Sequence, residues 1–377
     1  MIVYIRHSLR TWAIGTAFVV SAVSAGMPTV AVARETSTQL IILGAAAGRT
    51  SYGGHSHGGF SAAIAVGEDR YLIDFGRGWH DRYYEAGLGT AAAATGFAGL
   101  ETLRAAFITH LHSDHVVGYP ELLLFGSTEG LRRRKTPFQV FGPGSGGKLP
   151  PKSEKLEARE QIINPENPKP GTAEMTEFLY KAFASDLNDN ILDSGMPNPH
   201  KYIKVTDIAL PPDAAASHDD VSPRMSPFEI YKDENVHVTA TLVDHAPMFP
   251  SFAYRFDTKD GSVVFSGDTN RSANLIELAR GADVLVHEVI SEEWAESLFP
   301  VPRKPDQEAK LHHLLTSHTP VSEVGAVAEE ADVKVLVLSH LAPPTISTEK
   351  WLHDVKGFKG RVEVGLPLFK ITLPLQK

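Results

Sequence analysis

The stretch Thr109-His110-Leu111-His112-Ser113-Asp114-His115 places three histidines and an aspartate within seven positions. With 17 histidines in 377 residues, three specified histidines arise by chance about once in ten thousand starting positions, (17/377)³, so a functional motif is the better explanation. In an extended chain His110 and His112 point to the same side and can reach one metal ion. Asp114 and His115, on the turn that follows, would face a second ion. The stretch therefore predicts a metal site.

Composition limits what else the chain can be. It has no cysteine, which excludes disulfides, iron–sulfur clusters, thiolate nucleophiles and Cys-ligated zinc, so any metal must be held by His, Asp or Glu. Hydrophobic residues make up 42% of the chain, enough for a large folded core. Lys and Arg number 36 against 45 Asp and Glu, a formal charge of -9. Because nucleic-acid binding draws on a surplus of cations, this balance argues against nucleic acid as a partner.

The N-terminus has the pattern of an export signal over residues 1–33. Arg6 and Arg10 precede the apolar stretch Trp12–Ala25, and Ala31-Val32-Ala33 offers a small-x-small cleavage site. The apolar core is shorter than the roughly 20 residues that a membrane span needs, so we expect no stable span. The sequence predicts a periplasmic or secreted protein, with a retained N-terminal anchor as the alternative.

Four later apolar runs each stop at polar, ligand-type residues, as buried strands do when they deliver side chains to one edge of a sheet. They are 105–108 before Thr109-His110, 263–265 before Ser266-Gly267-Asp268, 284–286 before His287-Glu288, and 335–338 before Ser339-His340. Between the last two, Val321–Ala331 is expected to be a helix with Thr319 as N-cap and Pro320 in the first turn. Helices between buried strands indicate a layered α/β fold.

Earlier segments complete the expected framework. Gln39–Gly44 is predicted to be a strand, and Phe60–Val66 with Tyr71–Phe75 an antiparallel hairpin. From about 142 to 235 the composition shifts towards Pro, Lys, Glu and Asp, which we interpret as an insertion, either a lid or substrate wall or a peripheral ornament. Its one plausible amphipathic helix carries Met175, Phe178, Leu179, Ala182 and Phe183 at helical spacing.

With these motifs the chain resembles the metallo-β-lactamase superfamily, in particular its branch of ribonuclease Z and the zinc-dependent arylsulfatases and phosphodiesterases. Besides 110–115, the matching segments are Leu43-Gly44, Leu72–Gly76, Asp244-His245, Ala253–Phe256, Ser266–Thr269, Ala282–Glu288, Ser317–Thr319 and Leu338–His340. The resemblance implies an α/β fold of four layers, an αββα sandwich of two mixed β-sheets flanked by helices. The catalytic domain would span 34–377, with the insertion at about 142–235.

The resemblance also implies a complete ligand set. In it, His110, His112 and His245 hold one metal, Asp114, His115 and His340 hold the second, and Asp268 bridges the two. All ligand atoms are nitrogen or oxygen, which suits Zn²⁺ and tolerates Mn²⁺ or Fe²⁺, so we expect two zinc ions.

Two such ions share a water, lower its pKa and hold the resulting hydroxide against an ester centre. The leading interpretation is an exported dinuclear-zinc hydrolase of a small anionic ester, either an aryl or alkyl sulfate ester or a phosphodiester. We expect Asp114 to be a catalytic residue as well as a metal ligand. By its match to ribonuclease Z, His318 is a candidate general acid with Glu288 as orienting partner, the alternative being that His318 only caps or packs.

Other functions stay open. A ribonuclease Z-like tRNA 3′-endonuclease is opposed by the export signal, by the acidic charge and by only 23 positions between His245 and Asp268 (268 minus 245). A tRNA-binding arm could still lie within 142–235. A lactonase is a further alternative, whereas β-lactam hydrolysis fits the bridging aspartate poorly. A non-enzymatic metal- or ligand-binding module is also an alternative, but such a module would have no need to keep a second ion. A homodimer is also left open.

Three further groups are interpreted as parts of the solvated surface, the alternatives being that the loop histidines approach the metals or substrate and that the basic run attracts an anionic substrate. They are His55 and His57 in a glycine-rich loop, the basic run Arg132–Lys135, and His312-His313.

Overall fold

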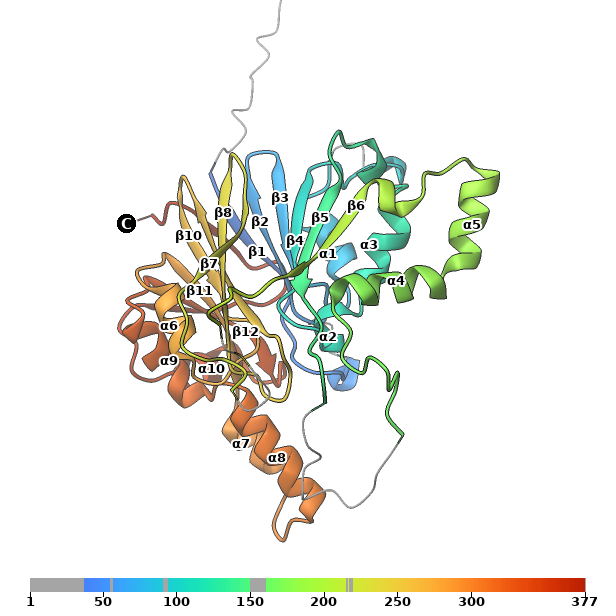
Figure 1. Ribbon diagram of the computed structural model, residues 1–377. Coiled ribbons are helices and arrows are strands. Elements are labelled where there is room, and N and C mark those ends of the chain that lie inside the picture. The colour runs from blue at the N-terminus through green and yellow to red at the C-terminus, as the bar shows by residue number, and fades with distance from the viewer. Residues whose placement is uncertain are drawn as a thin grey trace, which may run out of the picture. The chain divides into compact units, whose positions relative to one another are not determined.

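Two seven-stranded β-sheets face each other in the structure, a computed structural model that describes residues 37–54, 57–90, 94–149, 161–214, 216 and 220–376 (Figure 1). The first sheet has the order β14-β1-β2-β3-β4-β5-β6 and the second the order β13-β12-β11-β10-β9-β8-β7. Each contains parallel and antiparallel pairs. The expected sandwich of two mixed sheets is confirmed. The predicted signal over 1–33 lies outside the described residues and stays a prediction.

The strands of the first sheet come from the front of the chain except for its edge strand β14. They are β1 (Gln39–Gly44), β2 (Ser61–Val66), β3 (Asp69–Ile73), β4 (Leu103–Phe107), β5 (Phe138–Pro143), β6 (Ile203–Ile208) and β14 (Lys370–Thr372). The strands of the second sheet follow in the C-terminal half. They are β7 (Phe228–Lys232), β8 (Val236–Leu242), β9 (Phe252–Thr258), β10 (Gly261–Phe265), β11 (Val284–Ile290), β12 (Val335–Ala342) and β13 (Arg361–Val364).

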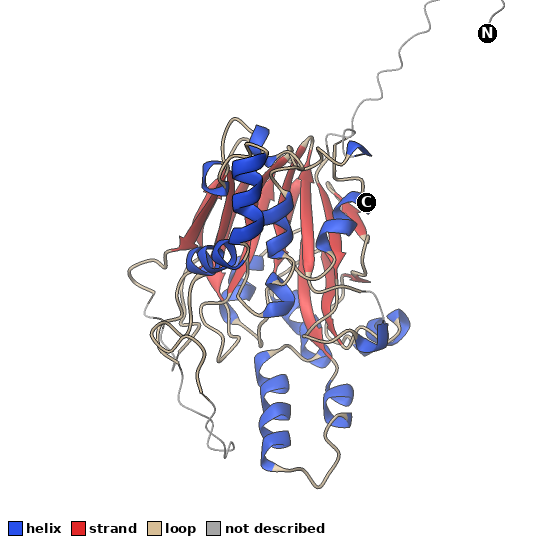
Figure 2. Ribbon diagram, turned by 90° about the vertical axis from the view of Figure 1, so that its right-hand side faces the viewer, coloured by secondary structure: helices blue, strands red, loops and turns tan. Residues whose placement is uncertain are grey.

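Helices cover the outer face of each sheet (Figure 1). Those between the strands of the first sheet are α1 (Trp79–Glu85), α2 (Ser113–Val116), α3 (Tyr119–Phe125), α4 (Thr172–Ala182) and α5 (Ala184–Asp193). Those between the strands of the second are α6 (Ala273–Ala279), α7 (Glu292–Ser297), α8 (Pro305–Ser317), α9 (Val321–Glu330) and α10 (Thr348–Asp354). The short 3-10 turns are η1 (Tyr52–Gly54), η3 (Leu131–Arg133) and η4 (Pro199–Lys201). Figure 2 shows α7 and α8 side by side, joined by a loop at one end of the sheets.

The period-two alternation of each strand fills separate cores. In β1, Leu40 and Ile42 point into the core between the sheets, whereas Ile41 and Leu43 point outward into the core beneath the helices. All four are fully buried, so each contributes about 2 kcal/mol of hydrophobic stabilisation. A strand that is apolar on both faces must be covered on both, which is why the layers number four.

The four runs predicted to end at the site are β4, β10, β11 and β12, but they belong to both sheets instead of one. β10, β11 and β12 are parallel neighbours, so their carboxyl ends share an edge. The end of β4 meets that edge because the Phe252 amide, at the start of β9, donates to the Thr109 carbonyl at 3.0 Å. The site is therefore built where two sheet edges come together.

Segment 142–235, expected as an insertion, contributes one of the two edge strands of each sheet. β6 pairs in parallel with β5 and β7 pairs antiparallel with β8. The predicted helix is confirmed as α4, which precedes β6 in the chain and packs on β5 and β6, but Phe178 and Phe183 of its predicted apolar face are exposed. The composition concealed the two strands because edge strands tolerate polar, partly exposed residues, and β7 has no fully buried residue.

Two smaller observations concern helices. The helix expected at Val321–Ala331 is confirmed as α9, but its N-cap is Pro320. The Thr319 hydroxyl, predicted to cap it, donates instead to the Thr269 carbonyl at 2.7 Å. Among the described residues, no helix is both long enough and apolar enough to cross a bilayer.

Candidate metal centre

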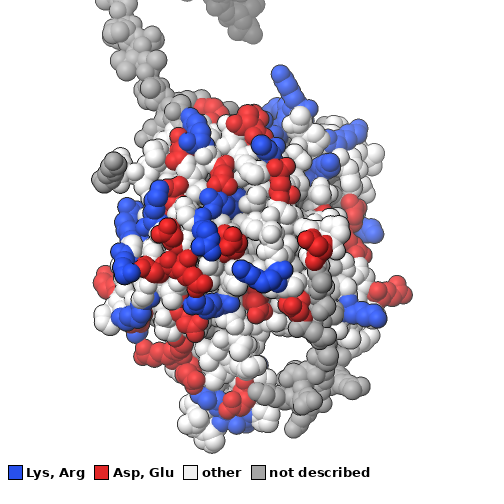
Figure 3. Space-filling view, turned by 60° about the vertical axis from the view of Figure 1, so that its left-hand side comes forward, with Lys and Arg blue, Asp and Glu red and all other residues white. Residues whose placement is uncertain are grey.

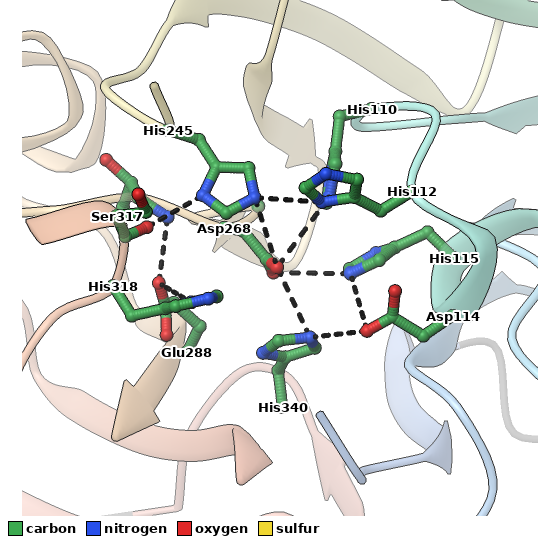
Figure 4. A network of polar contacts seen from close by, with 12 residues as sticks. His110, His112, Asp114, His115, His245, Asp268, Glu288, Ser317, His318 and His340 are labelled. Carbon is green, nitrogen blue, oxygen red and sulfur yellow. Dashed lines mark hydrogen bonds and ion pairs between the residues drawn. The ribbon is translucent and has the colours of Figure 1, made fainter. Parts of the chain in front are cut away.

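The 110–115 motif lies where β4 ends and α2 begins. His110 follows the strand, His112 is the N-cap of α2, and Asp114 and His115 lie inside its single turn. His110 and His115 are fully buried and Asp114 is nearly so. The sharp change from strand to helix turns all four side chains towards one point (Figure 4).

The second sheet supplies three more residues at the ends of its strands. His245 follows β8, Asp268 follows β10, and His340 lies within β12. His340 has a left-handed backbone, with φ of 46°, and the register between β11 and β12 shifts there, because Ser339 pairs with Glu288 and Leu341 with Val289. Such a bulge re-aims a side chain, and here it turns the His340 ring towards the other ligands.

Three imidazole nitrogens form the first ligand group. His110 Nε2 and His245 Nε2 each lie 3.1 Å from His112 Nδ1, and both lie 3.7 Å from Asp268 Oδ2.

The second ligand group consists of Asp114, His115 and His340. His340 Nε2 lies 3.3 Å from Asp114 Oδ2 and 3.3 Å from Asp268 Oδ2. His115 Nε2 lies 3.3 Å from Asp268 Oδ1 and 3.9 Å from Asp114 Oδ2. The Asp268 carboxylate therefore stands between the two groups and faces both (Figure 4).

These distances fit a pair of metal ions. With metal–nitrogen bonds of about 2.0–2.1 Å, neighbouring ligand atoms of a tetrahedral zinc site lie about 3.3 Å apart. His112 Nδ1 contacts two ring nitrogens at once, and because a neutral ring nitrogen carries at most one proton, hydrogen bonding cannot satisfy both contacts. Buried His115 Nε2 and Asp268 Oδ1 have no hydrogen-bond partner among the described residues. A cation in each group would satisfy these atoms.

Outer contacts fix two of the rings. The Asp74 carboxylate accepts from His115 Nδ1 at 2.8 Å, and also from the Thr109 amide and hydroxyl, both at 2.7 Å. The Ser317 carbonyl accepts from His245 Nδ1 at 2.7 Å. Contacts of this kind set the ring tautomer so that the other nitrogen is free to bind a metal.

The two groups differ in charge. Burial, together with the positive charge of His115, holds the pKa of His110 well below its usual value, and burial does the same for His245. Burial also opposes protonation of His115, but the carboxylates of Asp268, Asp74 and Asp114 raise the pKa of His115 well above its usual value. The first group thus offers neutral imidazoles, and the second an excess of negative charge.

His318 lies beside the ligands, just after α8. Its Nδ1 contacts Glu288 Oε1 at 3.0 Å, and Glu288 also accepts from the Thr269 amide at 2.9 Å. Burial opposes the charge of His318, but the charge and hydrogen bond of Glu288 outweigh it and raise the pKa of His318 to about 9. The residue predicted to act as an acid is therefore brought to the site together with its predicted partner.

A cavity of about 380 Å³ opens over the ligands. Eight of its lining residues were absent from the predicted site, and four of these have charged or aromatic side chains: Arg49, Tyr52, Trp294 and His313. His313 was expected at the surface, but it contacts the Ser317 hydroxyl at 3.0 Å and faces the cavity. No motif marks these residues, because only the packing of α7, α8 and the loop after β1 brings them here.

The remaining surface predictions have mixed outcomes. In the basic run, Arg133 pairs with Glu101 at 2.5 Å and Arg134 donates to the Glu101 carbonyl at 2.7 Å, so these two anchor a loop. His57 is absent from the residues lining the cavity. His55 lies outside the described residues.

Comparison with known proteins agrees with this site. Residues 57–308 match the family model described as the metallo-β-lactamase superfamily. A ribonuclease Z of Mycobacterium bovis is 30% identical over 318 residues, covering 84% of this chain and 92% of that protein. A ribonuclease Z of Mycobacterium marinum is 29% identical over 321 residues, with coverage of 84% and 92%.

Solved structures share the fold. Human tRNase Z, short form, superposes with a TM-score of 0.56 at 16% identity, covering 89% of this chain and 100% of that one. The metallo-β-lactamase-fold protein YhfI of Bacillus subtilis has a TM-score of 0.51 at 16% identity, with coverage of 89% and 99%.

The relatives correct one expectation. Nucleic acid was judged a poor partner from the acidic charge, yet the matching relatives are named ribonuclease Z, so that judgement is wrong. Net charge sums the whole surface and says little about one cleft. The geometry of the site and the match over 57–308 lead to one conclusion: the chain belongs to the metallo-β-lactamase superfamily and is one of its metal-dependent hydrolases.

Proposed function

We propose that this protein is a dinuclear metal-dependent phosphodiesterase that cleaves RNA, as its relatives named ribonuclease Z do. The observation that carries the proposal is the position of Asp268 between the two ligand groups, with His318 beside them in one cavity. The 30% identity to a ribonuclease Z over 84% of the chain supports the substrate class.

The six residues of the two groups, together with Asp268, would hold the ions, and zinc is our proposed metal because the donors are nitrogen and oxygen alone. Two such cations supply a nucleophilic water near neutral pH and neutralise charge on the phosphoryl oxygens. The carboxylate of Asp268 fixes the spacing of the two groups, since its Oδ2 faces His110 and His245 on one side and His340 on the other.

His318 is proposed to protonate the leaving oxygen. Its Nδ1 is engaged by Glu288, which leaves Nε2 available to donate a proton as the phosphorus–oxygen bond to the leaving nucleoside breaks. The raised pKa of His318, about 9, keeps the ring protonated at neutral pH. Cations beside it would lower that pKa towards the range in which a general acid works best.

An aromatic part of the cavity wall suits a nucleobase. Tyr52 and Trp294 lie with ring centroids 6.3 Å apart, and both line the cavity. Stacking of a base on an aromatic side chain contributes about 1–3 kcal/mol and accepts any base. A cavity of about 380 Å³ is within the usual range for small-molecule sites.

The test is a substrate panel with the zinc-loaded full chain. It contains a precursor tRNA with a 3′ extension, an unstructured RNA of equal length, bis(p-nitrophenyl) phosphate, p-nitrophenyl sulfate and a lactone. We expect cleavage of RNA and of the aryl phosphodiester, with no turnover of the last two. Turnover of the sulfate or the lactone without any phosphodiester cleavage would overturn the proposal.

A further inference from the structure

We propose that Arg49 and Arg77 form an anion subsite that binds the phosphate next to the scissile phosphodiester of a nucleic-acid strand. The inference rests on the proposed function in one respect, that the scissile group is a phosphodiester. It adds a binding site that the metal ligands and the His318–Glu288 pair do not account for.

A second cavity of about 160 Å³ adjoins the metal cavity. Its lining residues are Gly48, Arg49, Thr50, Gly58, Gly59, Arg77, Ser113, Asp114 and Val117. Gly48, Arg49 and Asp114 also line the metal cavity, so these three residues border both cavities. In the proposed binding mode, a strand held at the metal cavity passes Arg49, which lines both cavities, to reach the second one.

Both arginines are exposed and unpaired within the described parts of the chain. Other arginines are engaged: Arg104 pairs with Asp69 at 2.6 Å and Arg255 with Asp257 at 2.9 Å. The positive charge of Arg49 is felt by His112 and His313, since it contributes to lowering the pKa of each after burial. Its guanidinium thus lies close to the metal cavity.

The wall of the second cavity is held in place by close backbone packing. The Gly48 amide donates to Asp114 Oδ2 at 2.7 Å. A Cβ at Gly59 would lie 2.4 Å from the Asp114 carbonyl, and one at Gly58, whose φ is +66°, would lie 2.5 Å from the Arg77 carbonyl. Both positions require glycine, so the loop sits tightly against α2 and against Arg77. The lining residues with polar side chains are the two arginines, Thr50, Ser113 and Asp114.

These groups suit a phosphate monoanion. A guanidinium presents a planar fork of donors that matches phosphate oxygens, and hydroxyl donors from Thr50 and Ser113 complement it. On the face shown in Figure 3, by contrast, Lys and Arg alternate with Asp and Glu. Two unpaired cations beside the metal cavity provide the local positive charge that the net charge of -9 conceals.

The first experiment measures binding without turnover. Isothermal titration calorimetry compares adenosine 3′,5′-bisphosphate with adenosine 5′-monophosphate, using the zinc-loaded protein. One charge-assisted phosphate contact changes affinity by about 10-fold or more, so we expect the bisphosphate to bind at least 10-fold tighter. Arg77→Gln should abolish that preference and leave monophosphate affinity unchanged. Arg49→Gln should weaken both ligands, because Arg49 lines both cavities.

The matched control is Arg132→Gln, an exposed arginine on η3, which should keep the full preference. Arg77→Gln is expected to fold normally, since no described side chain forms a hydrogen bond or ion pair with its guanidinium and its carbonyl still accepts from the Gly59 amide. An unchanged bisphosphate preference in Arg77→Gln overturns the subsite. So does binding of inorganic phosphate that accounts for all of the Arg77-dependent heat, because the pocket would then hold free anions only.

Measurements of substrate turnover distinguish this inference from the proposed function. On a trinucleotide, Arg77→Gln should lower kcat/KM about 10-fold, and a neutral methylphosphonate at the neighbouring phosphate should remove that difference. Bis(p-nitrophenyl) phosphate, which has one phosphate, should be cleaved equally by both proteins. Equal losses on both substrates count against the subsite while the phosphodiesterase stands. Arg77-dependent binding in a protein that cleaves no phosphodiester would retain the subsite and refute the proposed function.

Discussion

The two ligand groups meet at one carboxylate but are built differently. The first consists of three imidazoles that follow strand ends or open a helix, with outer contacts to Thr109 and to the Ser317 carbonyl. The second combines a carboxylate with two imidazoles and depends on residues in strained conformations, since Asp74 has φ of 56° and His340 φ of 46°. A left-handed non-glycine residue costs about 1–3 kcal/mol.

The difference indicates where each ion obtains its affinity. The first group is electrically neutral and preassembled. The second concentrates buried negative charge from Asp114, Asp268 and Asp74 around His115, and a bound cation would have to offset the cost of its strained backbone. We therefore expect the second ion to be the more sensitive to changes outside the ligand set, whereas loss of Asp268 should affect both.

Asp268→Ala should have the largest effect, because it removes the carboxylate that faces both groups. We expect the bound metal to fall from two ions to one or none, and phosphodiester turnover to drop by about 10³-fold or more. Metal content is measured by atomic emission on the purified protein. The exposed Asp306→Ala on α8 is the control and should keep both ions; full metal content in Asp268→Ala would refute the shared role.

His318→Ala tests whether His318 belongs to the second group or acts beside it. Asp268, His318 and His340 lie close enough to form a ligand set of their own. As an acid, His318 should matter for poor leaving groups: we expect about a 10²-fold loss on RNA but little loss on bis(p-nitrophenyl) phosphate. Metal content should be unchanged. Loss of an ion, or equal losses on the two substrates, would mean that His318 is a ligand or a structural residue.

Asp74→Asn tests the outer contacts of the second group. The fully buried Asp74 carboxylate orients His115, and loss of such a partner typically lowers metal affinity 10–100-fold. We expect one ion to be retained and the other to dissociate at lower chelator concentration. Circular dichroism checks that the fold survives. Simultaneous weakening of both ions would show that the groups are not independent.

A histidine–glutamate ion pair outside the site provides a comparison for the contact between His115 and Asp74. His80 Nε2 lies 2.7 Å from Glu129 Oε2, close to the 2.8 Å between His115 and Asp74. Burial opposes the charge of His80, but Glu129, with smaller contributions from Glu121 and Asp81, raises the pKa of His80. A raised pKa contributes stability that is complete below the unfolded pKa of about 6.5 and is lost as pH rises through the folded pKa.

Glu129→Gln should accordingly destabilise the protein by about 1 kcal/mol at pH 6 and by clearly less at pH 9. Denaturant unfolding at the two pH values measures the difference, with the metal content held constant. Equal costs at pH 6 and pH 9 would show that the pair contributes through packing and not through charge.

Sequence patterns predicted the parts of the molecule that depend on near neighbours. The strands β1, β4, β10, β11 and β12, the helix α4 and the grouping of the 110–115 motif follow from local periodicity. The strands of segment 142–235 were harder to predict, because the edge strands β6 and β7 carry no continuous apolar run. The prediction that Thr319 caps the helix was also wrong, because its hydroxyl donates to the carbonyl of Thr269, 50 positions away in the chain.

The residues around the ligands could not be predicted in the same way. Asp74 is marked in the sequence only by the Leu72–Gly76 segment, and its contact with His115 joins positions 41 apart. Arg49, Tyr52, Trp294 and His313 come from separate loops and helices. The net charge led to a wrong prediction about nucleic acid, because a sum over the whole chain does not say where the charged side chains lie.

The sequence by itself determined the chemistry of this protein: nitrogen and oxygen donors without sulfur, in numbers and spacing that fit two metal ions. Only the tertiary structure decided how those donors are held, through the bulge at His340, the Asp74 contact and the meeting of two sheet edges. It also decided what surrounds them, including the unpaired arginines of the second cavity. The physical reason is range: ligand type and local spacing are properties of neighbouring residues, whereas a cavity wall and its charge are set by segments that folding alone brings together.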